Sequence, residues 1–162
     1  MNEVQLLKLL EKNARMSSDD LATVLEEEES KVLETLNDLE KEKIICGYHT
    51  IINWDKTNKE RVSAIIFADA TPEREYGYDR IAKKIYRYPE VESMYLVSGK
   101  NDFMIMIHGQ TMKDIAEFTA TKLACIDGIT ATSTLFILQT YKANDSIYAE
   151  EEEKRERLLV TP

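Results

Sequence analysis

The sequence has few cysteines and no long apolar run. Only Cys46 and Cys125 occur among 162 residues, and they form no Cys-x-x-Cys pair. With no sign of export, we expect both to be reduced thiols in a cytoplasmic protein, with no disulfide framework. No apolar run approaches the ~20 residues that a membrane helix needs. The first residues lack a basic region followed by an apolar core, so we expect neither a signal peptide nor a membrane protein.

Motifs that carry chemistry are missing as well. The sequence contains no phosphate-binding loop, no Ser-centred nucleophile elbow and no cluster of metal ligands. The two histidines, His49 and His108, have no cysteine or nucleophile motif beside them, so we interpret them as structural or surface residues. We therefore expect a protein that is not an enzyme and that uses no metal and no cofactor.

Basic residues are scarce in the first third of the chain. Residues 1–50 hold six Lys and Arg against twelve Asp and Glu, a net of −6. The other 112 residues hold fifteen against eighteen, a net of −3. A content of 43% apolar and 31% charged residues is typical of a soluble globular protein, so the uneven charge belongs to a folded acidic region.

Three short helices are predicted in this acidic region. Apolar residues recur at helical spacing in three places, residues 4–10, 21–25 and 32–39. Ser17 with Asp20 three residues later is a capping box that opens the second helix. The β-branched and aromatic residues of 44–52 then predict a strand. We expect a winged-type helix-turn-helix over residues 1–52, with the second and third helices forming the pair.

The rest of the chain predicts an α+β domain of the ferredoxin-like β-α-β-β-α-β order. A polar linker, residues 53–61, precedes it, and Trp54 is expected to pack at the domain junction rather than to bind a base. Within residues 62–142 the patterns predict strands over 62–68, 91–97, 103–107 and 129–141 and helices over 76–88 and 111–125. For the tail, residues 143–162, a short exposed helix over 148–159 and disorder are equally compatible with the sequence.

This strand order fixes which strands lie in the middle of the sheet. Right-handed crossovers place the first and third strands in the centre, with both helices on one face. Phe103–Ile107 is apolar without alternation, which indicates a central strand. Ser98–Asp102 joins it to the preceding strand as a tight turn. No segment remains to cover the other face, so we expect a homodimer that packs sheet against sheet.

Two sets of residues carry a resemblance to a known family. The first comprises Arg15, Ser17, Asp20, Leu21, Ala22, Val32, Leu36, Leu39, Glu40, Ile44, Ile45, Gly47 and Tyr48. The second comprises Pro89-Glu-Val91, Val97-Ser-Gly99-x-x-Asp102-Phe103, Asp127-Gly-Ile129-x-x-Thr132-x-Thr134 and Tyr141-Lys142. Over roughly residues 3–142 the chain resembles the leucine-responsive regulatory protein/AsnC (Lrp/AsnC) family of transcription regulators. The resemblance implies DNA binding, homodimers, rings of dimers such as octamers, and an effector pocket lined by the hairpin turn and the last strand of a neighbouring subunit.

The effector pocket that the resemblance implies consists of eight residues, Ser98, Gly99, Lys100, Asn101, Asp102, Thr132, Ser133 and Thr134. An amino acid needs donors for its carboxylate and an acceptor for its ammonium group. Backbone N–H groups around Gly99 can hold a carboxylate, Asp102 can hold an ammonium group, and the hydroxyls can complete the site. In the alternative interpretation, Gly99 and Asp102 only make the turn, and the hydroxyl residues only favour a strand.

The DNA-binding positions that the resemblance implies lie on the third helix, at Ser30, Lys31, Glu34, Thr35, Asn37 and Asp38. The sequence departs from the family here, because Glu26 and Glu28 stand where the family usually has a turn glycine and a capping serine. Affinity for DNA depends heavily on Lys and Arg neutralising phosphates, and only Lys31 is basic in the first two turns. An alternative is therefore an effector sensor without direct DNA binding, whose acidic helical domain contacts a protein partner.

Overall fold

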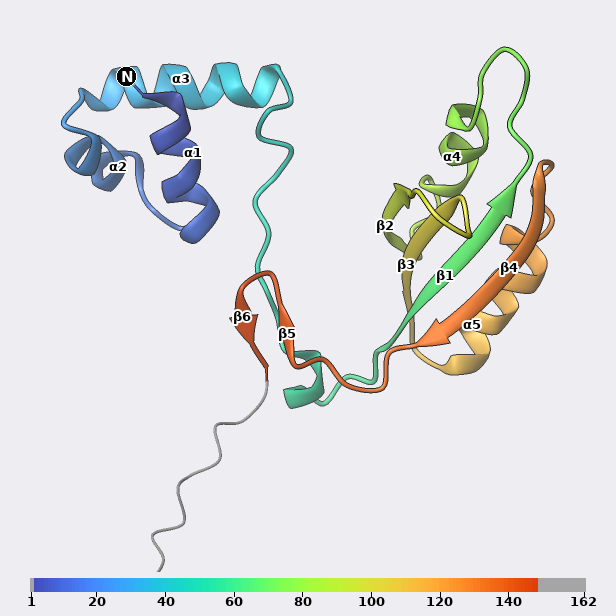
Figure 1. Cartoon of the computed structure of the whole chain (residues 1–162). Coiled ribbons are helices and arrows are strands. Elements are labelled where there is room, and N and C mark those ends of the chain that lie inside the picture. Colours follow the sequence, from blue (N-terminus) through green and yellow to red (C-terminus); the bar gives the residue numbers. More distant parts are fainter. Residues whose placement is uncertain (1, 149–162) are drawn as a thin grey trace, which may run out of the picture. The chain divides into compact units, whose positions relative to one another are not determined.

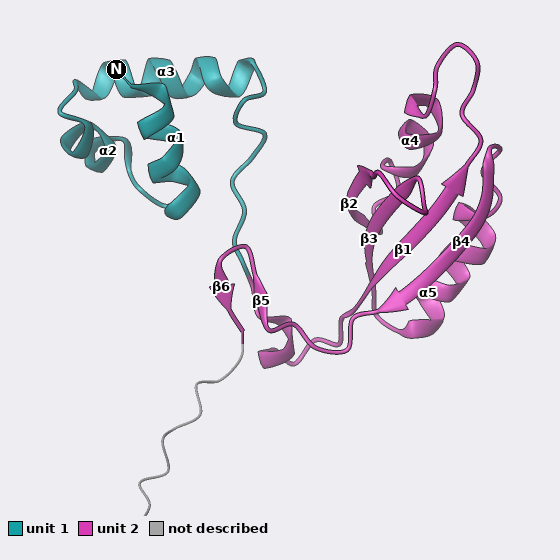
Figure 2. Cartoon of the chain, in the orientation of Figure 1, with its two compact units in different colours: residues 1–51 teal, residues 52–162 magenta. Residues whose placement is uncertain are grey.

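The structure is a computed structural model that describes residues 2–148, and it divides the chain into two compact units. Residues 1–51 form the first unit and residues 52–162 the second (Figure 2). The first unit contains α1 (Glu3–Lys12), α2 (Ser18–Leu25) and α3 (Glu29–Lys41), as predicted from the apolar spacing (Figure 1). No helix among the described residues is long and apolar enough to cross a membrane.

Each helix of the first unit contributes two residues to one small core, Leu6, Leu10, Leu21, Ala22, Val32 and Leu39. The predicted capping box of α2 is present. The Ser17 side chain accepts from the Asp20 backbone N–H, and the Asp20 side chain accepts from the Ser17 backbone N–H. Together these bonds satisfy two N–H groups that the first turn of the helix would otherwise leave unpaired.

The turn between α2 and α3 contains an unusual backbone conformation. Glu26, which ends α2, has a φ of 55° in the left-handed region. Residues with a Cβ rarely adopt this region, and glycine is the usual residue at such a position. Glu28 at the N-terminus of α3 makes no side-chain capping bond. Both acidic residues that depart from the family pattern therefore occupy positions where glycine and serine would favour the local backbone.

The strand predicted over residues 44–52 is wrong, because the structure has no strand there. The N–H groups of Ile44 and Ile45 instead donate to the Leu39 carbonyl, at 2.9 and 3.1 Å, and close the end of α3. A strand also needs a neighbouring strand, and the described residues place none beside this segment. The β-forming composition of the segment was therefore insufficient to predict a wing within one chain.

The second unit has the predicted order of elements. Its elements are β1 (Val62–Ala70), α4 (Asp79–Ile85), β2 (Val91–Leu96), β3 (Phe103–Gly109), α5 (Met112–Phe118) and β4 (Ile129–Phe136). The sheet is antiparallel with the order β2-β3-β1-β4, so the first and third strands are central, as predicted. A short 3₁₀ helix, η1 (Trp54–Lys56), precedes the sheet. A π-helical turn, η2 (Thr119–Leu123), extends α5.

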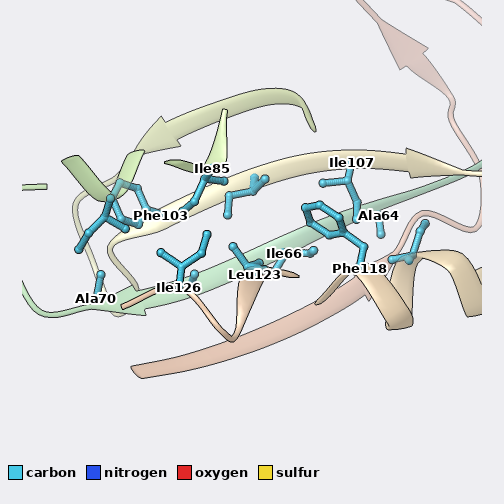
Figure 3. Close-up of a cluster of buried hydrophobic side chains, with 13 residues drawn as sticks. Ala64, Ile66, Ala70, Ile85, Phe103, Ile107, Phe118, Leu123 and Ile126 are labelled. Carbon is cyan, nitrogen blue, oxygen red and sulfur yellow. The ribbon is translucent and has the colours of Figure 1, made fainter. Parts of the chain in front are cut away.

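Both helices cover the same face of the sheet, where the core of this unit lies (Figures 1 and 3). Alternate residues of β1 and β3 point into this core, which consists of Ala64, Ile66, Ala68, Ala70, Ile81, Ile85, Phe103, Ile105, Ile107, Ile115, Phe118, Leu123 and Ile126. At ~25 cal/mol per Å² of apolar surface removed from water, this cluster is the main source of stability for the unit.

The other face of the sheet is open. The strand register places on it Ser63, Ile65, Phe67 and Asp69 of β1, Ser93 and Tyr95 of β2, Met104, Met106 and His108 of β3, and Ala131, Ser133 and Leu135 of β4. Neither α4 nor α5 covers this face (Figure 1). Phe103–Ile107 lacked alternation in the sequence because its open-face residues, Met104 and Met106, are apolar too.

Several predicted boundaries change. Helix α4 starts at Asp79 rather than residue 76, because the backbones of Glu73 and Gly77 pair with each other just before it. Strand β4 ends at Phe136 rather than residue 141. The tail begins with a two-stranded hairpin, β5 (Lys142–Ala143) and β6 (Ser146–Ile147). Almost all of the helix considered for 148–159 lies outside the described residues.

Candidate functional site

The turn Ser98–Asp102 is held rigidly against the end of β1. The Val97 N–H donates to the Asp102 carbonyl at 2.8 Å, and the Asp102 N–H donates to the Ala68 carbonyl at 3.2 Å. Gly99 has a φ of 143°, a backbone conformation that residues with a Cβ rarely adopt. Within the described part of the chain, the backbone N–H groups of residues 98–101 donate no hydrogen bond. The turn therefore presents a row of free donors on a fixed support.

The Asp102 carboxylate is engaged inside the protein through both oxygens. Its Oδ2 accepts from the Ala70 N–H and its Oδ1 from the Tyr78 hydroxyl, each at 2.8 Å. These bonds, the backbone one first, hold the pKa of Asp102 below its usual value, and the same carboxylate raises the pKa of Tyr78. The Tyr78 ring packs edge-on against Phe103, with centroids 5.5 Å apart. Asp102 therefore joins the turn to the helix-covered core.

A second carboxylate, Asp69 near the end of β1, also contacts the turn. Its Oδ1 accepts from Nδ2 of Asn101 at 2.8 Å. Asp69 alternates along β1 with the buried alanines, so it lies on the open face with Ile65 and Phe67. Sequence analysis did not select Asp69. Its alternation could have placed it on the open face, but its contact with the turn depends on a register that the sequence does not show.

The hydroxyl residues of β4 lie on two different faces. Thr132 pairs with Ala68 and Thr134 with Ile66, so both belong to the helix-covered face. Ser133 pairs with Phe67 and lies on the open face, two residues along the strands from the Asp69 pairing. The structure thus brings Ser133 to the same face as Asp69, and it separates Ser133 from the two threonines. The sequence analysis had included all three residues because the resemblance places the last strand in the effector pocket.

On α3, two of the three charged side chains at the predicted DNA-binding positions, Lys31 and Asp38, form ion pairs with nearby residues. Lys31 Nζ lies 2.8 Å from Glu27 Oε2, a contact that raises the pKa of Lys31 and lowers that of Glu27. Asp38 pairs with Lys41 at 3.4 Å. The Thr35 hydroxyl donates to the Lys31 carbonyl at 2.9 Å.

The other three predicted positions on α3, Ser30, Glu34 and Asn37, are exposed. The uncharged groups that this surface offers are thus the Ser30 hydroxyl and the Asn37 amide, beside a free acid at Glu34. A surface of this kind can contact the edges of bases, but it offers little positive charge for phosphates.

Comparison with known proteins identifies both parts of the chain. Residues 63–147 match the family model of the Lrp/AsnC ligand binding domain. The uncharacterized HTH-type transcriptional regulator YugG of Bacillus subtilis is 37% identical over 161 residues, which is 99% of this chain and 96% of that protein. The HTH-type transcriptional regulator LrpA of Pyrococcus abyssi is 31% identical over 137 residues, 85% of this chain and 94% of that one.

Solved structures share the fold. E. coli AsnC superposes with a TM-score of 0.64 and 20% identity, covering 85% of this chain and 91% of that one. The regulator NMB0573 of Neisseria meningitidis, solved as a complex with L-Met, gives 0.66 and 22%, covering 86% and 90%. These likenesses and the matches above confirm the resemblance seen in the sequence. The chain belongs to the Lrp/AsnC family of transcription regulators, whose members combine an HTH-type DNA-binding region with a ligand-binding domain.

Proposed function

We propose that this regulator binds DNA as a homodimer or a ring of dimers, and that an amino acid or a related small effector, bound beside the turn Ser98–Asp102, controls this binding. The observation that carries the proposal is the turn itself. Its free N–H groups are held in place by the Asp102 bonds to Ala70 and Tyr78. Successive backbone N–H groups in a turn favour an anion such as a carboxylate, which every amino acid carries.

The open sheet face supports the homodimer. Its central residues, among them Ile65, Phe67, Met104 and Met106, are half-buried within one chain and apolar. Large exposed apolar patches on folded proteins mark interaction surfaces. A two-fold axis parallel to the open face, lying in the plane of the interface, would pack the same patch of each subunit against the other and bury both patches. The turn Ser98–Asp102 lies at the end of this face, so the effector would bind at the boundary of two subunits.

Helices α2 and α3 are the proposed helix-turn-helix, with α3 reading DNA. The exposed neutral groups of Ser30 and Asn37 are the base-contacting candidates. Because Lys31 already pairs with Glu27, it would contribute little to phosphate binding. We therefore expect weak DNA binding by one dimer, with a shallow salt dependence because few phosphates are neutralised, and tighter binding by a ring that engages several half-sites at once. A protein that binds chromosomal DNA in this way would act in the cytoplasm.

A second function is favoured by one observation, the acidic balance of the first unit. Residues 1–50 carry a net charge of −6, and Glu34 lies on the exposed face of α3. A surface of this sign would favour a basic protein over a phosphate backbone. In this alternative, the chain senses its effector in the same way but passes the signal to a protein partner.

The two functions differ in the response to removing the acidic charges of α3. Glu34→Gln with Asp38→Gln would strengthen DNA binding in the first function, since two repelled acids are neutralised. In the second function the same double variant would weaken capture of a basic protein partner and leave DNA binding undetectable. Anisotropy titration of fragments from the protein's own promoter, at about 50 mM salt, separates the two.

A further inference from the structure

We propose that Asp69, and not Asp102, holds the ammonium group of the amino acid effector. This inference rests on the proposed function, and it assigns the charge-recognising residue of the same site. Sequence reasoning chose Asp102 because it closes the turn. The geometry points to Asp69 because of what each carboxylate already binds and because of the face on which each side chain is held.

The Asp102 carboxylate has little left to offer a ligand. One oxygen accepts from the Ala70 N–H and the other from the Tyr78 hydroxyl. Tyr78 packs against the helix-covered core, so the Asp102 side chain is held toward the interior of its own subunit. A ligand that recruited this carboxylate would have to break bonds that fix the turn. Asp102 is therefore a positioning residue for the turn.

The Asp69 carboxylate, in contrast to that of Asp102, has one oxygen available to a ligand. Its Oδ1 accepts from Asn101, whereas Oδ2 has no hydrogen-bond partner within the part of the chain that the structure describes. Its side chain is half-buried and lies on the open face. A carboxylate that loses part of its hydration without meeting a cation is costly, and a ligand ammonium group would supply the missing partner.

Asn101 places this acceptor beside the donors of the turn. Its side chain binds Asp69, and its backbone N–H is one of the free donors of residues 98–101. A single residue thus connects the anion-binding backbone to the cation-binding carboxylate. An α-amino acid carries its carboxylate and its ammonium group on one carbon, so it needs both functions close together. Ser133, two residues from the Asp69 pairing on the same face, is the hydroxyl best placed to join them.

The test uses Asp69→Asn, which removes the charge but keeps an oxygen that can accept from Asn101. Asp127→Asn is the matched control, because Asp127 is an exposed acid in the turn before β4. Thermal shift against the twenty L-amino acids first identifies those that bind the wild type. Calorimetry then measures their dissociation constants, and those of the corresponding deaminated carboxylic acids, for all three proteins.

We expect Asp69→Asn to weaken amino acid binding by about ten- to a hundredfold, the worth of a charge-assisted hydrogen bond. Asp127→Asn should bind like the wild type, and Asp69→Asn should bind the deaminated acids at least as well as the wild type does, because it no longer places an unpaired carboxylate beside them. If the wild type binds an amino acid and Asp69→Asn binds it equally well, the assignment of Asp69 is overturned while the effector site stands. If the wild type binds no amino acid, the proposed effector class and the role of Asp69 fail together.

A second measurement needs no folded variant. In the wild type, the deaminated acid should bind at least tenfold more weakly than the amino acid, because Asp69 then faces no cation. Equal binding of the two by the wild type would overturn the inference even if Asp69→Asn did not fold.

Discussion

Phe67→Asp should convert the proposed dimer into a folded monomer. Phe67 lies on central strand β1, with Met104 opposite it on β3 and Ser133 opposite it on β4. It therefore occupies the middle of the open face, and it is not one of the residues that form the core on the helix-covered face. A charge at this position would stay partly accessible to water in the monomer but would be buried in a dimer that packs sheet against sheet.

The size of the effect follows from burial and symmetry. Full burial of an exposed Phe side chain is worth about 1.5–3 kcal/mol, and Phe67 is already half-buried within one chain, so dimerisation would add roughly half of this at most. A two-fold interface contains the residue twice, so losing both contributes up to about 1.5–3 kcal/mol. Because each 1.4 kcal/mol is a factor of ten, the dissociation constant of the proposed dimer should rise by about one to two orders of magnitude. The cost of desolvating two new carboxylates would increase this figure further.

Sedimentation velocity over a range of concentrations measures this change, and circular dichroism checks that the variant is folded. Met112→Asp is the control, because Met112 is 53% exposed at the start of α5 in the opposite layer of the unit. It should remain a dimer. A folded Phe67→Asp that keeps the wild-type dissociation constant would refute dimerisation through the open face.

Four further substitutions test predictions of stability. Gly128→Ala should destabilise by about 2–4 kcal/mol, since φ is +98° and the added Cβ would lie 2.6 Å from Ile81 Cδ1. At Gly99 φ is +143° and no atom lies within 4 Å of the added Cβ, so Gly99→Ala should destabilise by only about 1–2 kcal/mol. Thermal denaturation measures both alanine variants. Glu26→Gly should stabilise by roughly 0.5–1 kcal/mol in urea titration, because it relieves the φ of 55° at some cost in chain entropy. Glu90→Gln should lower Tm at neutral pH, since the Lys122 hydrogen bond lowers the pKa of Glu90. The ionised Glu90 carboxylate stabilises the fold at pH values above the pKa of Glu90 in the unfolded chain. This stabilisation is lost as the pH falls through the lowered pKa of the folded protein. The difference in Tm between the wild type and Glu90→Gln should therefore shrink in acid.

Each of these predictions can fail clearly. If Gly128→Ala and Gly99→Ala lose the same free energy of unfolding, the added Cβ at residue 128 does not clash with Ile81. A loss of stability in Glu26→Gly would mean that the Glu26 side chain contributes more than its backbone strain costs. A Tm difference for Glu90→Gln that stays constant from neutral pH to about pH 3 would exclude the carboxylate charge as its cause.

The elements that sequence predicted well are those fixed by local signals. The capping box of α2 depends on a hydroxyl and an acid three residues apart, Ser17 with Asp20. The order of strands and helices in the second unit followed from apolar spacing and turn residues alone. The central position of Phe103–Ile107 followed because crossover rules leave few topologies for such an order.

The sequence was insufficient where the outcome depends on distant partners. Residues 44–52 have the composition of a strand, but a strand also needs a neighbour that the sequence cannot supply. The bonds of Asp102 to Ala70 and Tyr78, which are 32 and 24 residues away in the chain, could not be predicted from the sequence, and the role of Asp102 in ligand binding stays a prediction. The contact of Asp69 with Asn101 spans 32 residues and could not be predicted for the same reason.

Titration of the protein against a fragment of its own promoter at about 50 mM salt, with and without the amino acid that gives the largest thermal shift, tests the central claim most directly. We predict binding tighter to this fragment than to unrelated DNA, with a dissociation constant that changes when the amino acid is present. Absence of specific binding in both conditions would contradict the proposal that this chain is a DNA-binding regulator controlled by an amino acid.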